Sequence, residues 1–150
     1  MKTINHIRML APADVIFSLA ENVERWPILL RHYRYVFARD VPAGRMVRMG
    51  ARRGLIPVNW TALQIVDRAS LEIRYTHVAG VTRGMAVVWR LEPDGAVTDV
   101  TIDHVLTSPR IWLRNRAAEI VMGDGFVVPI ADATLRGIKY AAESGRRSAR

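Results

Sequence analysis

Residues 82–106, TRGMAVVWRLEPDGAVTDVTIDHVL, alternate apolar and polar side chains on both sides of an Asp-Gly pair at positions 94 and 95. This alternation is typical of β-strands that bury one face, and Asp-Gly is a strong signal for a two-residue hairpin turn. A turn at these residues predicts the cross-strand pairs Met85–His104, Val87–Ile102 and Trp89–Val100. These side chains then share one face, whereas Arg90 and Asp99 meet on the other. The turn and the alternation therefore predict the same antiparallel hairpin independently.

The alternation continues along the rest of the chain. Strands are predicted over 2–10, 33–39, 45–52, 58–66, 71–78, 82–92 and 96–106. Short loops at 67–70 and 79–81 predict two further cross-strand pairs, Trp60–His77 and Tyr75–Met85. In the strand at 33–39, the alternation places three aromatic side chains on one face: Tyr33, Tyr35 and Phe37.

Helical signals follow the first strand. Pro12 and Asp14 suit the first turn of a short helix over 15–20. Asn22 can cap a second short helix, which is expected to end before Pro27 because the residue preceding a proline is biased away from the helical region. The tryptophan immediately before that proline should anchor the second helix rather than contact solvent.

A long helix is predicted at the end of the chain. Pro109 ends the sheet region, residues from about 111 to 144 are helical, and Gly123-Asp124-Gly125 could break this helix. At 3.6-residue spacing, one mostly apolar stripe runs through Val127, Ile130, Thr134, Ile138 and Ala141. A strand, two short helices, six strands and a long helix make an α+β architecture. We expect a single domain over 1–150, with a frayed tail after about 144.

Strand parity brings large side chains to one wall of the sheet: Trp60, Tyr75, His77, Met85, Trp89, Ile102 and His104. The helix stripe could cover this wall, with Ile130 and Thr134 facing it. These side chains either fill a closed core or line a ligand cavity. Buried tryptophan and histidine nitrogens need hydrogen-bond partners, which favours a cavity for a hydrophobic small molecule.

No metal site is expected in this wall. His77 and His104 lie two strands and two residues apart in the predicted register, or roughly 12 Å from strand geometry. No carboxylate on the inner parity completes a ligand set. Neither a phosphate-binding loop nor a dinucleotide-binding glycine motif occurs, so no cofactor is predicted.

The segment APADVIFSLAENVERWPILLRHYRYV at 11–36 resembles the start of polyketide cyclases and START-related proteins, the SRPBCC or helix-grip superfamily. The matching positions of its helix and Trp-Pro motifs are Pro12, Val15, Phe17, Trp26, Pro27 and Leu30. Residues 78–89 and 126–143 fit the same pattern. The resemblance implies a curved seven-stranded antiparallel sheet wrapped around a long C-terminal helix. Because this superfamily includes aromatase/cyclases, lipid carriers, coenzyme Q-binding proteins and a ribosome-binding toxin, no catalytic residue is carried over by motif.

Charge and composition narrow the partners. The formal net charge is +8, and 20 of the 22 basic residues are arginines spread along the chain, which indicates a solvated surface rather than a nucleic-acid site. There is no cysteine, so disulfides and thiolate chemistry are excluded. No apolar run approaches the roughly 20 residues of a membrane span, and the N-terminus has no signal-peptide core. A cytoplasmic location is therefore expected, and the oligomeric state stays open.

Several functions remain open at this point. A polyketide aromatase/cyclase, or a catalytically silent relative with a similar ligand, has as catalytic candidates His77, His104 and Tyr75. Further groups that could contact a carbonyl oxygen are Tyr33, Tyr35, Arg48 and Arg52. A non-enzymatic lipid or quinone carrier needs only the cavity and a lid, for which Gly123 and Gly125 offer a hinge. A ribosome- or RNA-associated regulator is the third alternative, motivated by the positive charge.

Overall fold

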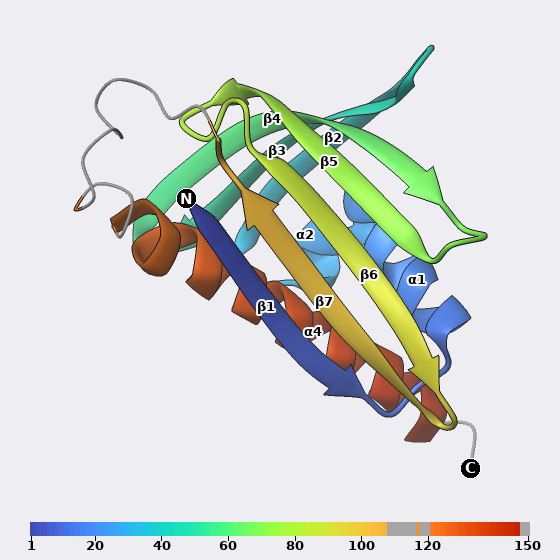
Figure 1. Cartoon of the computed structure of the whole chain (residues 1–150). Coiled ribbons are helices and arrows are strands. Elements are labelled where there is room, and N and C mark those ends of the chain that lie inside the picture. Colours follow the sequence, from blue (N-terminus) through green and yellow to red (C-terminus); the bar gives the residue numbers. More distant parts are fainter. Residues whose placement is uncertain (108–116, 118–120, 148–150) are drawn as a thin grey trace.

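The computed structural model describes residues 1–107, 117 and 121–147. Its core is a seven-stranded antiparallel sheet in the order β1-β7-β6-β5-β4-β3-β2, which curves around a long C-terminal helix (Figure 1). The strands are β1 (Lys2–Met9), β2 (Tyr33–Val41), β3 (Gly44–Arg53), β4 (Ile56–Asp67), β5 (Glu72–Gly80), β6 (Ala86–Asp94) and β7 (Val97–Val105). The helical elements are α1 (Ala13–Glu21), η1 (Val23–Arg25), α2 (Trp26–Leu29), η3 (Gly123–Val127) and α4 (Val128–Arg147). The predicted α+β helix-grip class is confirmed.

Helix α4 is fixed to the sheet by polar contacts as well as by its apolar stripe. Asn5 Nδ2 on β1 donates hydrogen bonds to the Val128 carbonyl at 3.2 Å and to Asp132 Oδ1 at 2.6 Å. The buried side of the helix is formed by Val127, Ala131, Thr134, Leu135, Ile138 and Ala142. A Cβ atom at Gly137 would lie 2.3 Å from Leu30 Cδ2, so a glycine there lets α4 approach the end of α2 closely. Of the predicted stripe, Thr134, Ile138 and Val127 (the last residue of η3) are buried, whereas Ile130 and Ala141 are half-buried.

The β6–β7 turn lies one residue later than predicted. Its two central residues are Gly95 and Ala96, and Asp94 pairs with Val97. The predicted turn would have made Pro93 part of the closing hydrogen-bonded pair, but proline has no N–H to donate. In the observed turn Gly95 has φ of 62°, which suits glycine at the first central position of a type II′ turn.

This shift moves the register by two residues and leaves every side chain on its predicted face. Met85 is not opposite His104 as predicted, because the observed pairs are Val87–His104, Trp89–Ile102 and Leu91–Val100. Arg90 lies opposite Thr101 and forms ion pairs with Asp103 and Glu72 rather than with Asp99.

The two preceding predicted pairs are wrong in the same way. Tyr75 lies opposite Val87 rather than Met85, because β6 begins only at Ala86 and the connection from β5 is longer than three residues. A bulge between Thr61 and Ala62 places Ala62, not Trp60, opposite His77. Trp60 and Ala62 are two residues apart on β4, so Trp60 and His77 still share the inner face.

The aromatic face predicted for 33–39 is split by a second bulge. The register shifts between Tyr33 and Tyr35, which leaves Tyr33 buried and turns Tyr35 and Phe37 to the outer face. Their rings stack with centroids 5.5 Å apart, and Phe37 is 65% exposed. Gly50 accommodates this arrangement, since a Cβ there would lie 2.3 Å from Tyr35 Cε1.

The helices also differ from prediction at their ends. Pro12 is the N-cap of α1 rather than a residue of its first turn, and Asn22 makes no side-chain capping hydrogen bond. Pro27 lies inside the first turn of α2, where its missing N–H is no cost. The helix predicted after Asn22 corresponds to η1, which ends at Arg25, before Pro27, whereas α2 was not predicted. Trp26 is buried at 3% exposure, as predicted.

The C-terminal helical region is continuous over its described part. The Gly123-Asp124-Gly125 segment forms a π-helical turn that runs directly into α4 instead of breaking it. Helix α4 extends to Arg147, beyond the fraying point expected near residue 144. The predicted sheet end at Pro109 and the helix start near 111 lie outside the described residues. No helix in the described part of the chain has the length and apolar character needed to span a membrane.

Candidate functional site

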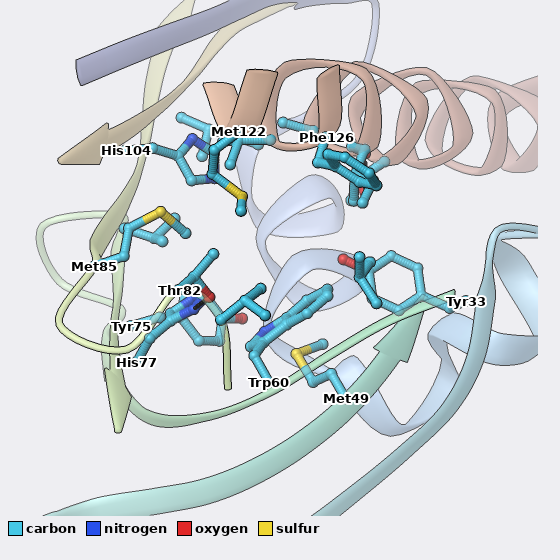
Figure 2. Close-up of a pocket in the computed structure, with 18 of the residues that line it drawn as sticks. Tyr33, Met49, Trp60, Tyr75, His77, Thr82, Met85, His104, Met122 and Phe126 are labelled. Atoms are coloured by element: carbon cyan, nitrogen blue, oxygen red, sulfur yellow. Dashed lines mark hydrogen bonds between the residues drawn. The ribbon is translucent and has the colours of Figure 1, made fainter. Parts of the chain in front are cut away.

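A cavity of about 90 Å³ lies between the concave face of the sheet and the helical segment of η3 and α4 (Figure 2). Its walls are mostly apolar, and it reaches solvent on one side. The nine residues predicted to bind a ligand all line it: Trp60, Tyr75, His77, Met85, Trp89, Ile102, His104, Ile130 and Thr134. The structure thus brings the predicted set together around one space, and their binding of a ligand stays a prediction.

Aromatic rings form the floor of the cavity. Trp26 contacts Tyr33 edge to face with ring centroids 5.0 Å apart, and its centroid lies 5.9 Å from that of Trp89. Trp26 Nε1 donates to the Leu19 carbonyl at 3.0 Å, which satisfies its buried N–H. Trp60 stacks almost parallel on His77, with centroids 5.8 Å apart and an interplanar angle of 4°. These contacts hold the rings in fixed orientations at the wall.

Sequence reasoning missed several lining residues. Among them are Trp26, Tyr33, Met49, Thr82, Met122 and Phe126. Trp26 was expected to be buried, but only as an anchor. Tyr33 was a candidate donor to a ligand carbonyl but was not placed among the wall residues, whereas Met49 faces inward opposite the buried Val36. A parity count on β3 that started from Val47 could have found Met49.

His77 is held in its neutral form at the cavity wall. Its side chain is buried, and Nδ1 lies 2.6 Å from Thr82 Oγ1 in the β5–β6 connection. Burial, with a smaller contribution from His104, lowers the pKa of His77 to about 3. A neutral imidazole can therefore hydrogen-bond Thr82 across the physiological range.

His104 has an unsatisfied ring nitrogen. Burial lowers its pKa to about 4, with Asp103 acting weakly in the opposite direction. No described residue hydrogen-bonds its buried Nδ1, and Thr3 Oγ1, on the residue opposite in β1, is also buried without a partner. Buried polar atoms in native proteins are normally paired. The two unpaired atoms thus belong to residues that face each other directly on β7 and β1.

Tyr75 is arranged as a hydrogen-bond donor. Gln64 Nε2 donates to the Tyr75 hydroxyl at 3.0 Å and to the Glu21 carbonyl at 3.1 Å. The tyrosine oxygen is thus an acceptor in that bond, and its own proton is left to donate elsewhere. Burial raises the pKa of Tyr75 above its usual value, so the hydroxyl stays protonated.

The second tyrosine of the wall lies next to Thr134. Burial raises the pKa of Tyr33, and a hydrogen bond with Thr134 opposes part of this effect. Thr134 Oγ1 donates to the Ile130 carbonyl at 2.7 Å and lies 2.9 Å from His32 Nε2. Because the threonine proton is used by Ile130, its oxygen is an acceptor toward Tyr33 and His32. This cluster fixes the helix side of the cavity.

Three other candidates do not reach the cavity. Arg48 and Arg52 are exposed, and Tyr35 lies on the outer face with the Arg48 guanidinium 6.0 Å from its ring centroid. No aspartate or glutamate is among the lining residues of the described chain. Within the same residues, no three histidine or acidic side chains come together as a metal site. The polar side-chain groups of this wall are therefore neutral hydroxyl, imidazole and indole groups.

The chain is similar to a Streptomyces cyaneus protein provisionally named a polyketide cyclase. The two are 29% identical over 111 residues, which cover 69% of this chain and 72% of that protein. No protein-family model matches the chain.

Solved structures show the same architecture. The ZhuI aromatase/cyclase of Streptomyces sp. R1128 superposes with a TM-score of 0.82 at 19% identity, covering 99% of this chain and 97% of that one. A START superfamily protein of Mycobacterium smegmatis superposes with a TM-score of 0.70 at 13% identity, covering 95% and 97%.

Proposed function

We propose that this chain binds an aromatic or polyketide-type molecule in the cavity and promotes its cyclisation. The resemblance to polyketide cyclases and START-related proteins is confirmed, because the chain has their helix-grip fold and a sequence relative with a polyketide cyclase name. The observation that carries the proposal is the apolar cavity itself. Its wall includes Tyr75, whose hydroxyl accepts from Gln64 and so keeps its proton to donate, and the neutral imidazole of His104.

These groups suit an intramolecular aldol addition, in which one C–C bond forms and the proton taken up by His104 passes to the new alkoxide oxygen. A neutral His104 would accept a proton from a carbon between two carbonyl groups, and that carbon would then bond to another carbonyl carbon of the folded chain. Negative charge would develop on the attacked oxygen, where the Tyr75 hydroxyl could donate a hydrogen bond. Since a pKa near 4 makes His104 a weak base, most of the acceleration would come from holding the chain in a folded conformation.

A non-enzymatic carrier is the second candidate. Both cavity imidazoles have strongly lowered pKa values, and no carboxylate is among the described lining residues to support one as a base. General acid-base catalysis is most effective when the catalytic pKa lies near the operating pH. A carrier of a lipid or quinone needs only the apolar space. The lowered imidazole pKa values and the lack of a carboxylate among the described lining residues therefore favour a carrier over an enzyme.

Native mass spectrometry of the purified protein tests the shared claim, since a co-purified hydrophobic molecule would add its mass and reveal its chemistry. Tyr75→Phe and His104→Asn then separate the two candidates with that molecule or a poly-β-ketone analogue. A cyclase should keep binding and lose turnover in both variants. A wild-type protein that binds without turnover is a carrier, and a protein that binds neither kind of molecule contradicts both candidates.

A further inference from the structure

Large aliphatic side chains stand in solvent around one end of the cavity. Leu55 is 96% exposed and Ile56 53% exposed in the β3–β4 hairpin, Val81 is 41% exposed after β5, and Val121 is 61% exposed before η3. We call these four residues the apolar rim. The same three segments supply cavity-lining residues, namely Val58, Thr82 and Met122. Figure 1 shows the β5–β6 connection and the start of the C-terminal helical region at the same end of the molecule.

The fold does not require this apolar character at the hairpin tip. Gly54 takes the left-handed conformation that the turn needs, with φ of 59°, and nothing lies within 4 Å of its Cβ position. Polar residues normally occupy such turns. Leucine and isoleucine at the tip therefore lack a structural reason within the described chain, and exposed apolar groups at one place mark an interaction site.

Arginines without an ion-pair partner in the described chain lie next to the apolar rim in the sequence. Arg52 and Arg53 precede the hairpin tip and Arg83 follows Thr82; all three are exposed, and none forms an ion pair with a described residue. Five other arginines of the described chain have carboxylate partners: Arg8, Arg45, Arg68, Arg74 and Arg90. Arg34, Arg39 and Arg48 on β2 and β3 have no described carboxylate partner, but they lie outside the rim segments. The acidic side chain of the described rim segments is Asp124 on η3. The rim thus combines aliphatic tips with a net positive charge.

We propose that the apolar rim docks on the surface of an anionic lipid bilayer. Leu55 and Ile56 insert among the acyl chains, and the three arginines contact lipid phosphates. Docking places this end of the cavity against the membrane, so a hydrophobic ligand can enter without crossing water. The entry of a ligand from the membrane rests on the proposed function, whereas the docking on the bilayer does not.

Aliphatic side chains distinguish a bilayer from a nucleic acid. Single-stranded nucleic acids bind to aromatic side chains on which bases stack, and the exposed stacked pair Tyr35 and Phe37 lies on the outer face of β2, away from the cavity wall. The rim presents leucine, isoleucine and valine, which gain from transfer into hydrocarbon. Because only two aliphatic side chains insert and three arginines contact phosphates, binding to the bilayer should be reversible and should be weakened by salt.

Co-sedimentation with lipid vesicles tests this docking. The protein should bind vesicles of phosphatidylcholine mixed with phosphatidylglycerol, and bind poorly to phosphatidylcholine alone. Leu55→Ser with Ile56→Ser should weaken binding roughly tenfold or more. Arg52→Gln with Arg53→Gln should weaken it about fivefold for each arginine removed. The matched controls are Ile28→Ser, at an isoleucine 83% exposed on α2, and Arg136→Gln, at an exposed arginine on α4.

The outcomes separate docking from ligand binding. The proposal is overturned if the rim variants bind vesicles as well as the wild type, or if the control variants lose as much binding as the rim variants. It is also overturned if the wild type does not bind anionic vesicles. Binding to single-stranded RNA instead, lost in the same rim variants, also overturns it. Tryptophan fluorescence titration with naphthol in the absence of vesicles reports the cavity independently. It should be unchanged in the rim variants, so vesicle binding without naphthol binding contradicts the proposed function alone.

Discussion

His77 and His104 are buried as neutral imidazoles, so they link folding stability to pH. Burial lowers their pKa values to about 3 and about 4, whereas an unfolded chain titrates both near 6.5. Between about pH 6.5 and 4 the unfolded chain therefore binds protons that the folded chain does not. The free energy of unfolding is therefore not reduced by these histidines above about pH 6.5. As the pH drops through this window, it falls by up to about 1.4 kcal/mol per pH unit for each imidazole.

Urea unfolding at a series of pH values measures this slope. The double variant His77→Asn with His104→Asn should show a clearly flatter dependence between about pH 6.5 and 4, because His32, whose pKa is also lowered by burial, then carries what remains of the histidine effect. His32→Asn is the matched control and should remove less of the slope. A wild-type stability that is constant over this window would contradict neutral burial of the two cavity imidazoles.

Single residues also show what sequence could and could not predict at the site. Strand alternation was sufficient to bring seven predicted residues around one cavity, because side-chain direction repeats every two residues whatever the register. The other two, Ile130 and Thr134, came from the 3.6-residue spacing of the helix. Strand alternation failed for Tyr35, since the bulge after Tyr33 has no sequence signal such as a glycine. It also gave no indication that His104 Nδ1 would lack a partner, which depends on the contacts of several strands and the helix.

At the scale of elements, the β5–β6 connection is tied to the cavity wall by one side-chain contact. Thr82 Oγ1 hydrogen-bonds His77, and the backbone N–H groups of Gly84 and His77 bond to the His77 and Met85 carbonyls at 2.8 and 2.9 Å. Thr82→Val keeps the shape and removes the hydroxyl, leaving His77 Nδ1 buried without a partner. This should cost about 1–3 kcal/mol of local stability.

Amide hydrogen exchange measures that local stability. Residues 81–85 should exchange about 5- to 150-fold faster in Thr82→Val, as expected for a loss of about 1–3 kcal/mol. Thr82→Ser retains a hydroxyl and should restore most of the protection. If the serine and valine variants exchange alike, the hydroxyl does not hold this connection on the cavity.

The sequence predicted which strands pair, but not which residues lie opposite each other. Hairpins were found where expected, yet the β6–β7 turn moved by one residue because Pro93 cannot close the predicted turn. That correction was available from the sequence, whereas the bulge at Thr61 and Ala62 was not. In each case the shift left the side chains on their predicted face of the sheet. The residues of the cavity wall were therefore predicted better than the cross-strand pairs.

At the scale of the whole molecule, the curved sheet and α4 enclose a space that packing does not fill. Polar groups of Tyr75 and His104 border this space, and cavity-lining segments at one end carry the apolar rim. The helix-grip fold followed from the order of elements and from the Trp-Pro segment. The size of the cavity could not be predicted, because it depends on the volumes of lining side chains such as Ala131, Trp89 and Met49.

The most direct test of the central claim is a naphthol titration, followed by tryptophan fluorescence, of a variant in which the cavity is filled. Ala131 is buried on the helix side of the cavity, so Ala131→Leu should occupy the space, keep or raise the melting temperature and abolish naphthol binding. Ala133→Leu, on the same helix but outside the cavity lining, should bind like the wild type. Naphthol binding that persists unchanged in a folded Ala131→Leu protein would contradict a ligand site between the sheet and the C-terminal helix.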